Sequence, residues 1–171
     1  MRLMHLAVLA WVVICLIGLF AYSQSTLIDF DDERLYRAAQ DADFDTEFAQ
    51  FAESKLQHAL KSTVIHFSSQ DGCLCEYVAQ KHIQAVTALA NEMGKHNVSI
   101  SLHDNQLWQP FIPATPAIAV FDENGVLSYL GPYATGSGCF TGDGIVEKHL
   151  DSVSLIGATI PLDAKGCYCR T

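Results

Sequence analysis

Two cysteines stand at the point where a short apolar run gives way to a helical pattern. The run, residues 63–67, is rich in β-branched side chains and ends at a polar turn that contains Gly72, and Cys73 and Cys75 follow at once. This order predicts a strand, a turn and then a helix that begins with both thiols. A helix N-terminus has unpaired N–H groups and partial positive charge, so it favours a thiolate over a thiol. Cysteines in this position are candidates for reactivity at neutral pH.

Four further cysteines differ in their surroundings. Cys15 lies in an apolar run and is expected to be a packing residue. Cys139 lies in a glycine-rich loop, and Cys167 and Cys169 repeat the Cys-x-Cys spacing near the C-terminus. In an oxidising compartment such residues form disulfides, and the structural expectation is a bridge from Cys139 to Cys167 or Cys169. Five cysteines outside the apolar run is an odd number, so at least one stays free, binds a ligand or pairs between molecules. Spacing alone does not determine the connectivity.

The N-terminal segment is long and apolar. Residues 3–22 carry no charged side chain, Arg2 precedes them, and four acidic residues follow at positions 29 and 31–33. This length spans a bilayer, and the positive end is expected to stay in the cytoplasm. Residues 1–23 are therefore predicted to be a single-pass anchor, with the rest of the chain outside the cytoplasm in a bacterial periplasm. The alternative is a signal peptide cleaved near Ala21-Tyr22-Ser23.

The charge of the chain argues against polyanionic partners. The formal net charge is −9, and the basic residues are not clustered. Nucleic acids and anionic membrane surfaces are poor partners for such a chain.

The hydrophobic pattern predicts a single α/β domain. Residues 24–62 read as a helical lead-in, 63–160 as the folded domain, and 161–171 as a cysteine-containing tail. Within the domain we expect strands at 63–67, 98–102, 116–121 and 126–130, and helices at 75–93 and 145–156. The Asp-Glu-Asn-Gly sequence at 122–125 predicts a hairpin turn. The fold class expected is a central mixed sheet flanked by helices.

This order of elements resembles the thioredoxin-like superfamily over about residues 63–156. His66-Phe67 ends the first strand, Cys75 comes 8 residues after Phe67, and Thr115-Pro116 lies 41 residues beyond Cys75. The sequence Pro-Ala-Ile-Ala-Val-Phe-Asp-Glu-Asn-Gly at 116–125 is very similar to the strand and turn that follow the proline in that family. The chain departs from the family in having Cys-x-Cys where Cys-x-x-Cys is usual. The resemblance implies a thioredoxin-like fold with a cis proline facing the cysteines.

The resemblance also implies roles for particular residues. An ungapped match places Cys75 on the resolving cysteine and Gly72 on the nucleophile, and a shift by one residue places Cys73 on the nucleophile. Because Cys73 lies nearer the exposed turn, we expect Cys73 to attack and Cys75 to resolve. Thr115-Pro116 is expected to offer a backbone edge to a substrate peptide. A bridge within Cys-x-Cys requires that the two residues are not both helical, because residues two apart on a helix point about 200° apart. His66 occupies the place of a buried acid and is expected either to relay a proton or to be a core histidine. Cys139, Cys167 and Cys169 are then structural or resolving cysteines.

The predicted function is that of a membrane-anchored thiol-disulfide oxidoreductase or isomerase. Its partners would be exported protein thiols or a redox partner protein, with no cofactor, no resident metal and no nucleic acid. One alternative is a copper- or zinc-handling protein, since paired cysteines offer soft thiolates. The other is a non-catalytic binding module in which the paired cysteines are structural.

Overall fold

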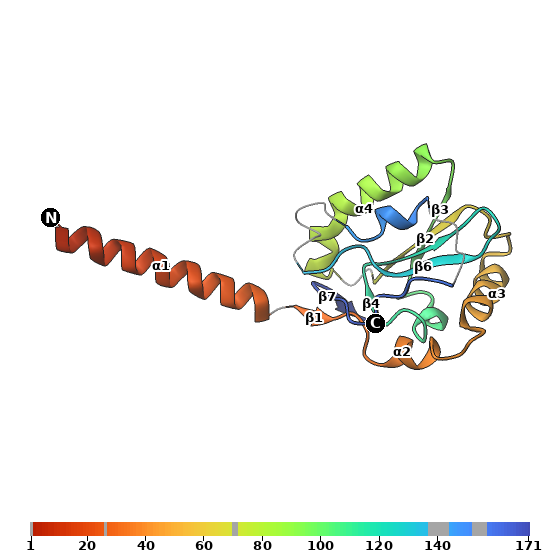
Figure 1. Cartoon of the computed structure of the whole chain (residues 1–171), viewed down its shortest axis with the longest axis horizontal. Helices are drawn as coiled ribbons and strands as arrows, with labels where there is room; N and C mark the ends of the chain where they lie inside the picture. The colour runs from red at the N-terminus through yellow and green to blue at the C-terminus, as the bar shows by residue number, and fades with distance from the viewer. Residues whose placement is uncertain (1, 26, 70–71, 137–143, 152–156) are drawn as a thin grey trace.

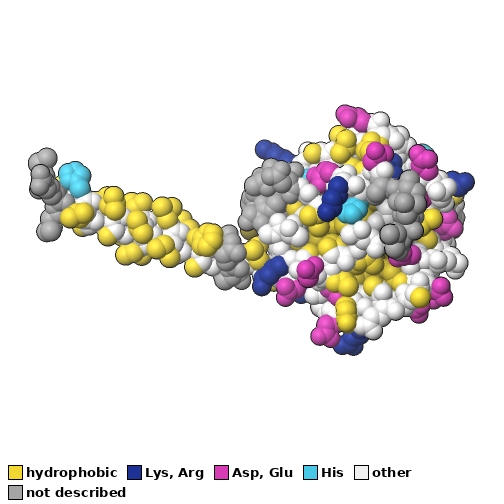
Figure 2. Space-filling model, viewed as in Figure 1, with side chains coloured by type: hydrophobic (Ala, Val, Ile, Leu, Met, Phe, Trp, Pro, Cys, Tyr) yellow, Lys and Arg dark blue, Asp and Glu magenta, His cyan; other side chains and the backbone are white. Residues whose placement is uncertain are grey.

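The N-terminal helix stands apart from the rest of the chain. The computed structural model describes residues 2–25, 27–69, 72–136, 144–151 and 157–171. Helix α1 (Arg2–Ser25) extends away from the domain (Figure 1). Its segment Met4–Tyr22 is long and apolar enough to cross a membrane, and none of it is buried. Figure 2 shows apolar side chains along this helix and mixed charges over the domain. The predicted long apolar helix is confirmed.

A four-stranded mixed sheet forms the centre of the domain. Its order is β3-β2-β5-β6, with β2 and β3 parallel and the other neighbours antiparallel. The strands are β2 (Thr63–Ser68), β3 (His96–Ser101), β5 (Ala117–Phe121) and β6 (Leu127–Pro132). Parallel neighbours need a crossover, which helix α4 (Leu74–Glu92) provides between β2 and β3. The predicted mixed α/β architecture is confirmed.

Strand β5 shows how the sheet separates two cores. Ala117, Ala119 and Phe121 face one apolar cluster, and Ile118 and Val120 face another. Successive side chains of a strand point to opposite faces, so this run of five buried residues is covered on both sides. Figure 1 shows α4 and α3 on opposite sides of the sheet.

Aromatic packing holds helix α3 on the face of the sheet to which Phe121 points. The lead-in contains α2 (Arg34–Ala38) and α3 (Phe44–Leu56). Phe48 of α3 is fully buried, and its ring lies 5.3 Å from the ring of Phe111 and 6.2 Å from that of Phe121. Phe111 follows the short 3-10 helix η1 (Gln106–Trp108).

Helix α4 covers the opposite face of the sheet and ends as the sequence predicts. Val86 and Ala90 pack in the same cluster as Val64 of β2. Gly94 has φ +73°, and the Lys95 N–H donates to the Ala90 carbonyl over 2.9 Å. This positive φ is the conformation in which helices end and glycine is favoured.

The helix expected near the end of the domain is the clearest error of the sequence-based prediction. Where a helix was expected over 145–156, the described residues form only the 3-10 turn η2 (Glu147–His149), and residues 152–156 lie outside the description. Val146 and Leu150 are both buried, so one short turn already satisfies the apolar spacing that suggested a helix. β-branched Ile145 and Val146 and the short polar Asp151 also lower helix propensity.

The C-terminal segment is part of the folded domain. Strand β7 (Lys165–Gly166) pairs with β1 (Ile28–Asp29), which follows the N-terminal helix. Strand β8 (Cys169–Arg170) pairs with β4 (Ala114–Thr115) just before Pro116. These strands are two residues long, too short to be recognised from side-chain alternation.

Candidate functional site

The two central cysteines occupy different backbone conformations at the start of α4. Cys73 is the N-cap residue, with extended φ −62° and ψ 128°, whereas Cys75 lies in the first helical turn. The predicted position of both thiols at a helix start is confirmed. The change of conformation between them also meets the requirement for a bridge within Cys-x-Cys.

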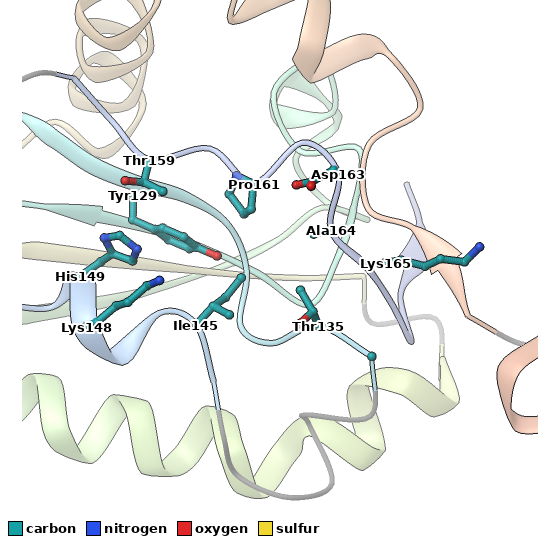
Figure 3. Close-up of a pocket in the computed structure, with 11 residues that line it drawn as sticks. Tyr129, Thr135, Ile145, Lys148, His149, Thr159, Pro161, Asp163, Ala164 and Lys165 are labelled. Carbon is teal, nitrogen blue, oxygen red and sulfur yellow. The ribbon is translucent and has the colours of Figure 1, made fainter. Parts of the chain in front are cut away.

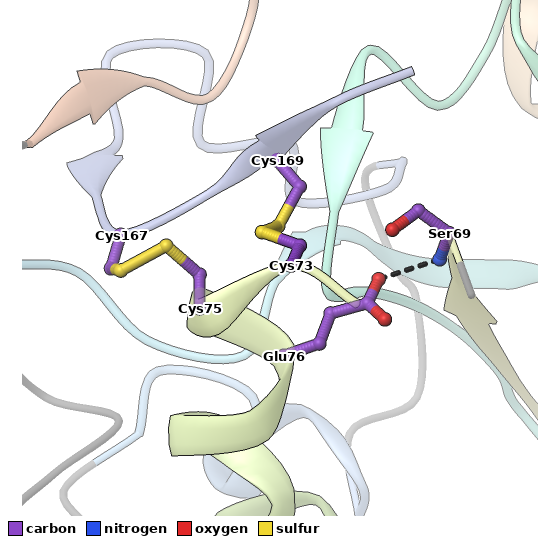
Figure 4. Close-up of a disulfide and its surroundings, with 6 residues drawn as sticks. All are labelled: Ser69, Cys73, Cys75, Glu76, Cys167 and Cys169. Carbon is purple, nitrogen blue, oxygen red and sulfur yellow. Dashed lines mark hydrogen bonds between the residues drawn. A yellow bond between two sulfur atoms is a disulfide. The ribbon is translucent and has the colours of Figure 1, made fainter. Parts of the chain in front are cut away.

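Each of these cysteines forms a disulfide with the tail (Figure 4). Cys73 is bonded to Cys169, with 6.3 Å between Cα atoms, and Cys75 is bonded to Cys167, with 5.3 Å. Both separations are usual for disulfides. The tail is therefore bonded to the helix start through both of its cysteines. The structure places no bond between Cys73 and Cys75.

The expected bridge from Cys139 to the tail is wrong. Cys167 and Cys169 are both bonded to the helix start, so neither is available. Cys139 itself lies outside the described residues.

Noncovalent contacts also hold the tail in place. The buried Tyr168 hydroxyl donates to the Ala134 carbonyl over 2.7 Å, and its ring packs edge-on against Phe30 with centroids 5.4 Å apart. Arg170 donates to the Phe30 carbonyl over 3.0 Å, and the Thr171 hydroxyl donates to the Ile112 carbonyl over 2.7 Å. The tail cysteines are thus positioned by contacts on both sides.

The predicted Thr115-Pro116 step lies beside this tail. Its peptide bond is cis, as the resemblance implies. Thr115 is buried and is the direct antiparallel partner of Cys169. The structure therefore brings this step to Cys73 through the tail, while its role in binding substrate stays a prediction.

Three sulfurs form a compact cluster. The Sγ atoms of Cys73, Cys75 and Cys169 all lie within 4.8 Å of one another. Cys169 is 8% exposed, whereas Cys73 and Cys75 are half-buried. As disulfides these sulfurs are not thiolates; once reduced, they and Cys167 would be the donors available to a soft metal ion.

An open depression of about 520 Å³ gives access to Cys73. The side chains of Leu74 and Tyr77 at its border are 71% and 76% exposed. Its lining comes from the end of β2 and the first turns of α4: Ser68, Gly72, Cys73, Leu74, Glu76, Tyr77, Gln80 and Ile83. Among the described residues of this lining, Cys73 is the only cysteine, so an external thiol in the depression meets Cys73 first.

Glu76 is a site residue that the sequence analysis missed. Its Oε1 accepts a hydrogen bond from the Ser69 N–H over 2.5 Å, which joins the first turn of α4 to the end of β2 (Figure 4). A Glu three residues after an N-cap is typical of a capping box, but the observed bond to Ser69 lies outside that motif and depends on the geometry of the turn.

His66 lies in a different environment from the one its proposed role needs. Its ring is hydrogen-bonded through Nδ1 to the Tyr133 hydroxyl and through Nε2 to Asn97 Oδ1 over 2.7 Å. Asn97 is in turn bonded to Asn91 near the end of α4, about 25 Å along the helix from its first turn. Burial lowers the pKa of His66, although the Asn97 hydrogen bond opposes this. These contacts support the core-histidine interpretation, and a role for His66 in proton relay stays a prediction.

A second cavity of about 480 Å³ lies under the segment that leads to the tail (Figure 3). The rings of Tyr129 and His149 stack at its wall, with centroids 4.8 Å apart. Burial, and then the charge of Lys148, lower the pKa of His149. Among the described residues, none of those that line this cavity is a cysteine.

The fold and the site together define an α/β domain with a two-disulfide cluster at a helix start. Residues 40–171 match a family described as a domain of unknown function (DUF6436), and the chain belongs to this family. The matched range includes all four disulfide-bonded cysteines. No curated protein and no solved structure matches the chain.

Proposed function

We propose that this chain is a membrane-anchored, thioredoxin-like protein that exchanges disulfides with the thiols of exported proteins. The reaction takes place outside the cytoplasm, and Cys73 is the residue that meets the partner thiol. One observation carries the proposal. An extended segment is disulfide-bonded to Cys73 while its backbone pairs with Ala114–Thr115 beside Pro116. A peptide substrate joined to Cys73 would have the same two contacts.

The position of Cys73 suits it to this reaction. Cys73 lines the depression, whereas Cys169 is buried, so an incoming thiolate attacks Cys73. A bond then forms between the partner sulfur and Cys73, the Cys73–Cys169 bond breaks, and its electron pair stays on Cys169. The helix N-terminus stabilises the Cys73 thiolate that forms when the partner leaves.

The proposal is tested with the full chain in detergent and a synthetic peptide that carries two thiols. The wild-type chain should oxidise the peptide to its disulfide, and Cys73→Ser should reduce the rate to that of the uncatalysed reaction. Cys15→Ser is the matched control and should retain the wild-type rate. Unchanged peptide oxidation by Cys73→Ser would remove Cys73 from the reaction.

The second candidate is a non-catalytic module in which both disulfides only fasten the tail. It is favoured by the burial of Cys169 and by the hydrogen bonds of Tyr168 and Thr171. Alkylation before and after mild reduction separates the two functions. Disulfides that resist mild reduction, together with no peptide oxidation, would favour the structural role.

A further inference from the structure

We propose that the four disulfide-bonded cysteines form one exchange centre. In this centre a bond forms between Cys73 and Cys75, and the tail cysteines Cys167 and Cys169 become free thiols. The proposal rests on the proposed function and adds an internal step to it. Disulfide exchange needs three sulfurs close together: the attacking one, the attacked one and the leaving one. For the internal step these are Cys73, Cys75 and Cys167: the Sγ atoms of Cys73 and Cys75 lie within 4.8 Å of each other, and Cys75 is bonded to Cys167.

The backbone at the helix start permits the internal bond. Cys73 is extended and only Cys75 is helical, so the two side chains are not forced apart as they would be within a regular helix. The bond therefore involves only the N-cap and first turn of α4.

The tail keeps its cysteines in place when the disulfides open. Tyr168, between the two cysteines, is 6% exposed and bonded to the Ala134 carbonyl. Arg170 and Thr171 after them are bonded to the carbonyls of Phe30 and Ile112. Groups held in position react far faster than the same groups free in solution. Exchange among the four sulfurs is therefore expected to be faster than exchange with a second molecule.

The first stage is the oxidation of a protein dithiol. One substrate thiolate attacks Cys73, so that a mixed disulfide forms and Cys169 leaves as a thiolate. The second substrate thiolate attacks the substrate sulfur of the mixed disulfide, and Cys73 leaves with the electron pair. The substrate is oxidised by two electrons, and Cys73 and Cys169 are reduced. Of the two protons lost by the substrate thiols, one is taken up by Cys169 and one is released to water.

The second stage transfers the remaining disulfide within the chain. The Cys73 thiolate attacks Cys75, the Cys73–Cys75 bond forms, and the Cys75–Cys167 bond breaks. The electron pair goes to Cys167, which takes up a proton from water, and no net electrons are transferred in this step. Cys167 and Cys169 are now thiols, and the disulfide that remains again includes Cys73 at the open depression. The chain can then accept two further electrons through the same entry sulfur.

The experiment maps the disulfides after partial reduction. The full chain with Cys15→Ser and Cys139→Ser is placed in detergent and treated with one equivalent of dithiothreitol. Acid quenching, alkylation with N-ethylmaleimide and peptide mass spectrometry then identify the free thiols. The expected two-electron-reduced species has a Cys73–Cys75 disulfide, with Cys167 and Cys169 alkylated. Alkylation of Cys73 with Cys169, or of Cys75 with Cys167, without any Cys73–Cys75 disulfide would overturn the proposal.

A serine variant tests the same step without reductant. In Cys167→Ser the Cys75 thiol has lost its partner and is expected to attack Cys73, so that part of the protein carries Cys73–Cys75 and a free Cys169. The matched variant Cys75→Ser removes the attacking sulfur and should retain Cys73–Cys169. Cys73–Cys169 as the sole disulfide of Cys167→Ser would contradict the exchange.

The same preparations distinguish the inference from the proposed function. If the dithiol peptide is oxidised while Cys73–Cys75 never forms, the internal step is wrong and the function remains. If Cys73–Cys75 forms while the peptide is not oxidised, the internal step stands and the proposed function is wrong.

Discussion

At the scale of single residues, Cys73 combines a helix N-terminus, an open depression and a disulfide to the tail. The sequence was sufficient to locate the thiols, because the strand, turn and helix that hold them are contiguous in the chain. Their bonding partners lie 92 and 96 residues away, and no local pattern determines which tail cysteine each meets. The same limit applies to His66, whose place in the strand was predictable and whose partners Tyr133 and Asn97 depend on packing.

The first residue-scale prediction concerns Glu76→Gln. The amide still accepts the Ser69 N–H, but a negative charge near the Cys73 thiol is removed. Two unit charges about 4 Å apart in water interact by about 1 kcal/mol, so the reduced Cys73 should be alkylated about fivefold faster at pH 7. The measurement is the alkylation rate of the reduced protein. Glu92→Gln at the exposed far end of α4 is the control, and equal rates in both variants would contradict the role of Glu76.

The second residue-scale prediction concerns pH and His66. Burial lowers the pKa of His66 in the folded chain, while in the unfolded chain it is close to 6.5. Below this pH the unfolded state binds a proton that the folded state does not bind, so the free energy of unfolding falls as the pH is lowered. His149 has a lowered pKa and acts in the same direction. Above pH 6.5 neither histidine makes the free energy of unfolding depend on pH.

The test compares the denaturant midpoint at pH 7.5 and pH 5.5. His66→Gln should show a smaller difference between the two than the wild type, because one of the two histidines is gone. His58→Gln, at an exposed position, should retain the wild-type difference. A difference in His66→Gln as large as in the wild type would show that His66 is protonated in the folded state.

At the scale of secondary-structure elements, buried strands and the long amphipathic helix were predictable because each has its own periodicity. The helix expected over residues 145–156 was a wrong prediction, since apolar spacing cannot distinguish a helix from a single 3-10 turn such as Glu147–His149. The strands β7 and β8 were not predictable either, because two residues show no alternation and their partners β1 and β4 are far away in the sequence.

The element-scale prediction concerns the bonds between α4 and the tail. Replacing both Cys167 and Cys169 by Ser should lower the free energy of unfolding by about 2–5 kcal/mol, because each disulfide closes a long loop and restricts the unfolded chain. Denaturant unfolding of the double variant and of Cys15→Ser measures the difference. Equal stability of the two variants would show that the noncovalent contacts of Tyr168 and Thr171 suffice to hold the tail.

At the scale of the whole molecule, the apolar N-terminal helix was predictable from length and composition alone. Met4–Tyr22 is 19 residues long, about 28 Å at 1.5 Å per residue, which matches the hydrocarbon thickness of a bilayer. The side on which the domain lies depends on the flanking charges and stays a prediction.

The whole-molecule prediction concerns membrane anchoring. Leu9→Arg places a charge within the span and should cost about 2.5–3.5 kcal/mol of insertion, so less of the chain should stay in the membrane fraction after an alkaline wash. Leu107→Arg changes an equally exposed leucine of the domain and should leave that fraction unchanged. Intact mass measurement of the wild-type chain checks the alternative, because loss of about 23 residues would identify a cleaved signal peptide.

The pairing of β1 with β7 limits where the sulfurs can be. Helix α1 ends at Ser25 and β1 begins at Ile28, so the connecting chain reaches at most about 10 Å. Ile28 pairs with Gly166, and Cys167 is the next residue. With α1 in the bilayer, the two disulfides would remain within about 20 Å of the lipid headgroups. Such a tether would restrict the protein to partners that are emerging from the membrane or lying on it, whereas those that diffuse far from the lipid would have to approach its surface to react.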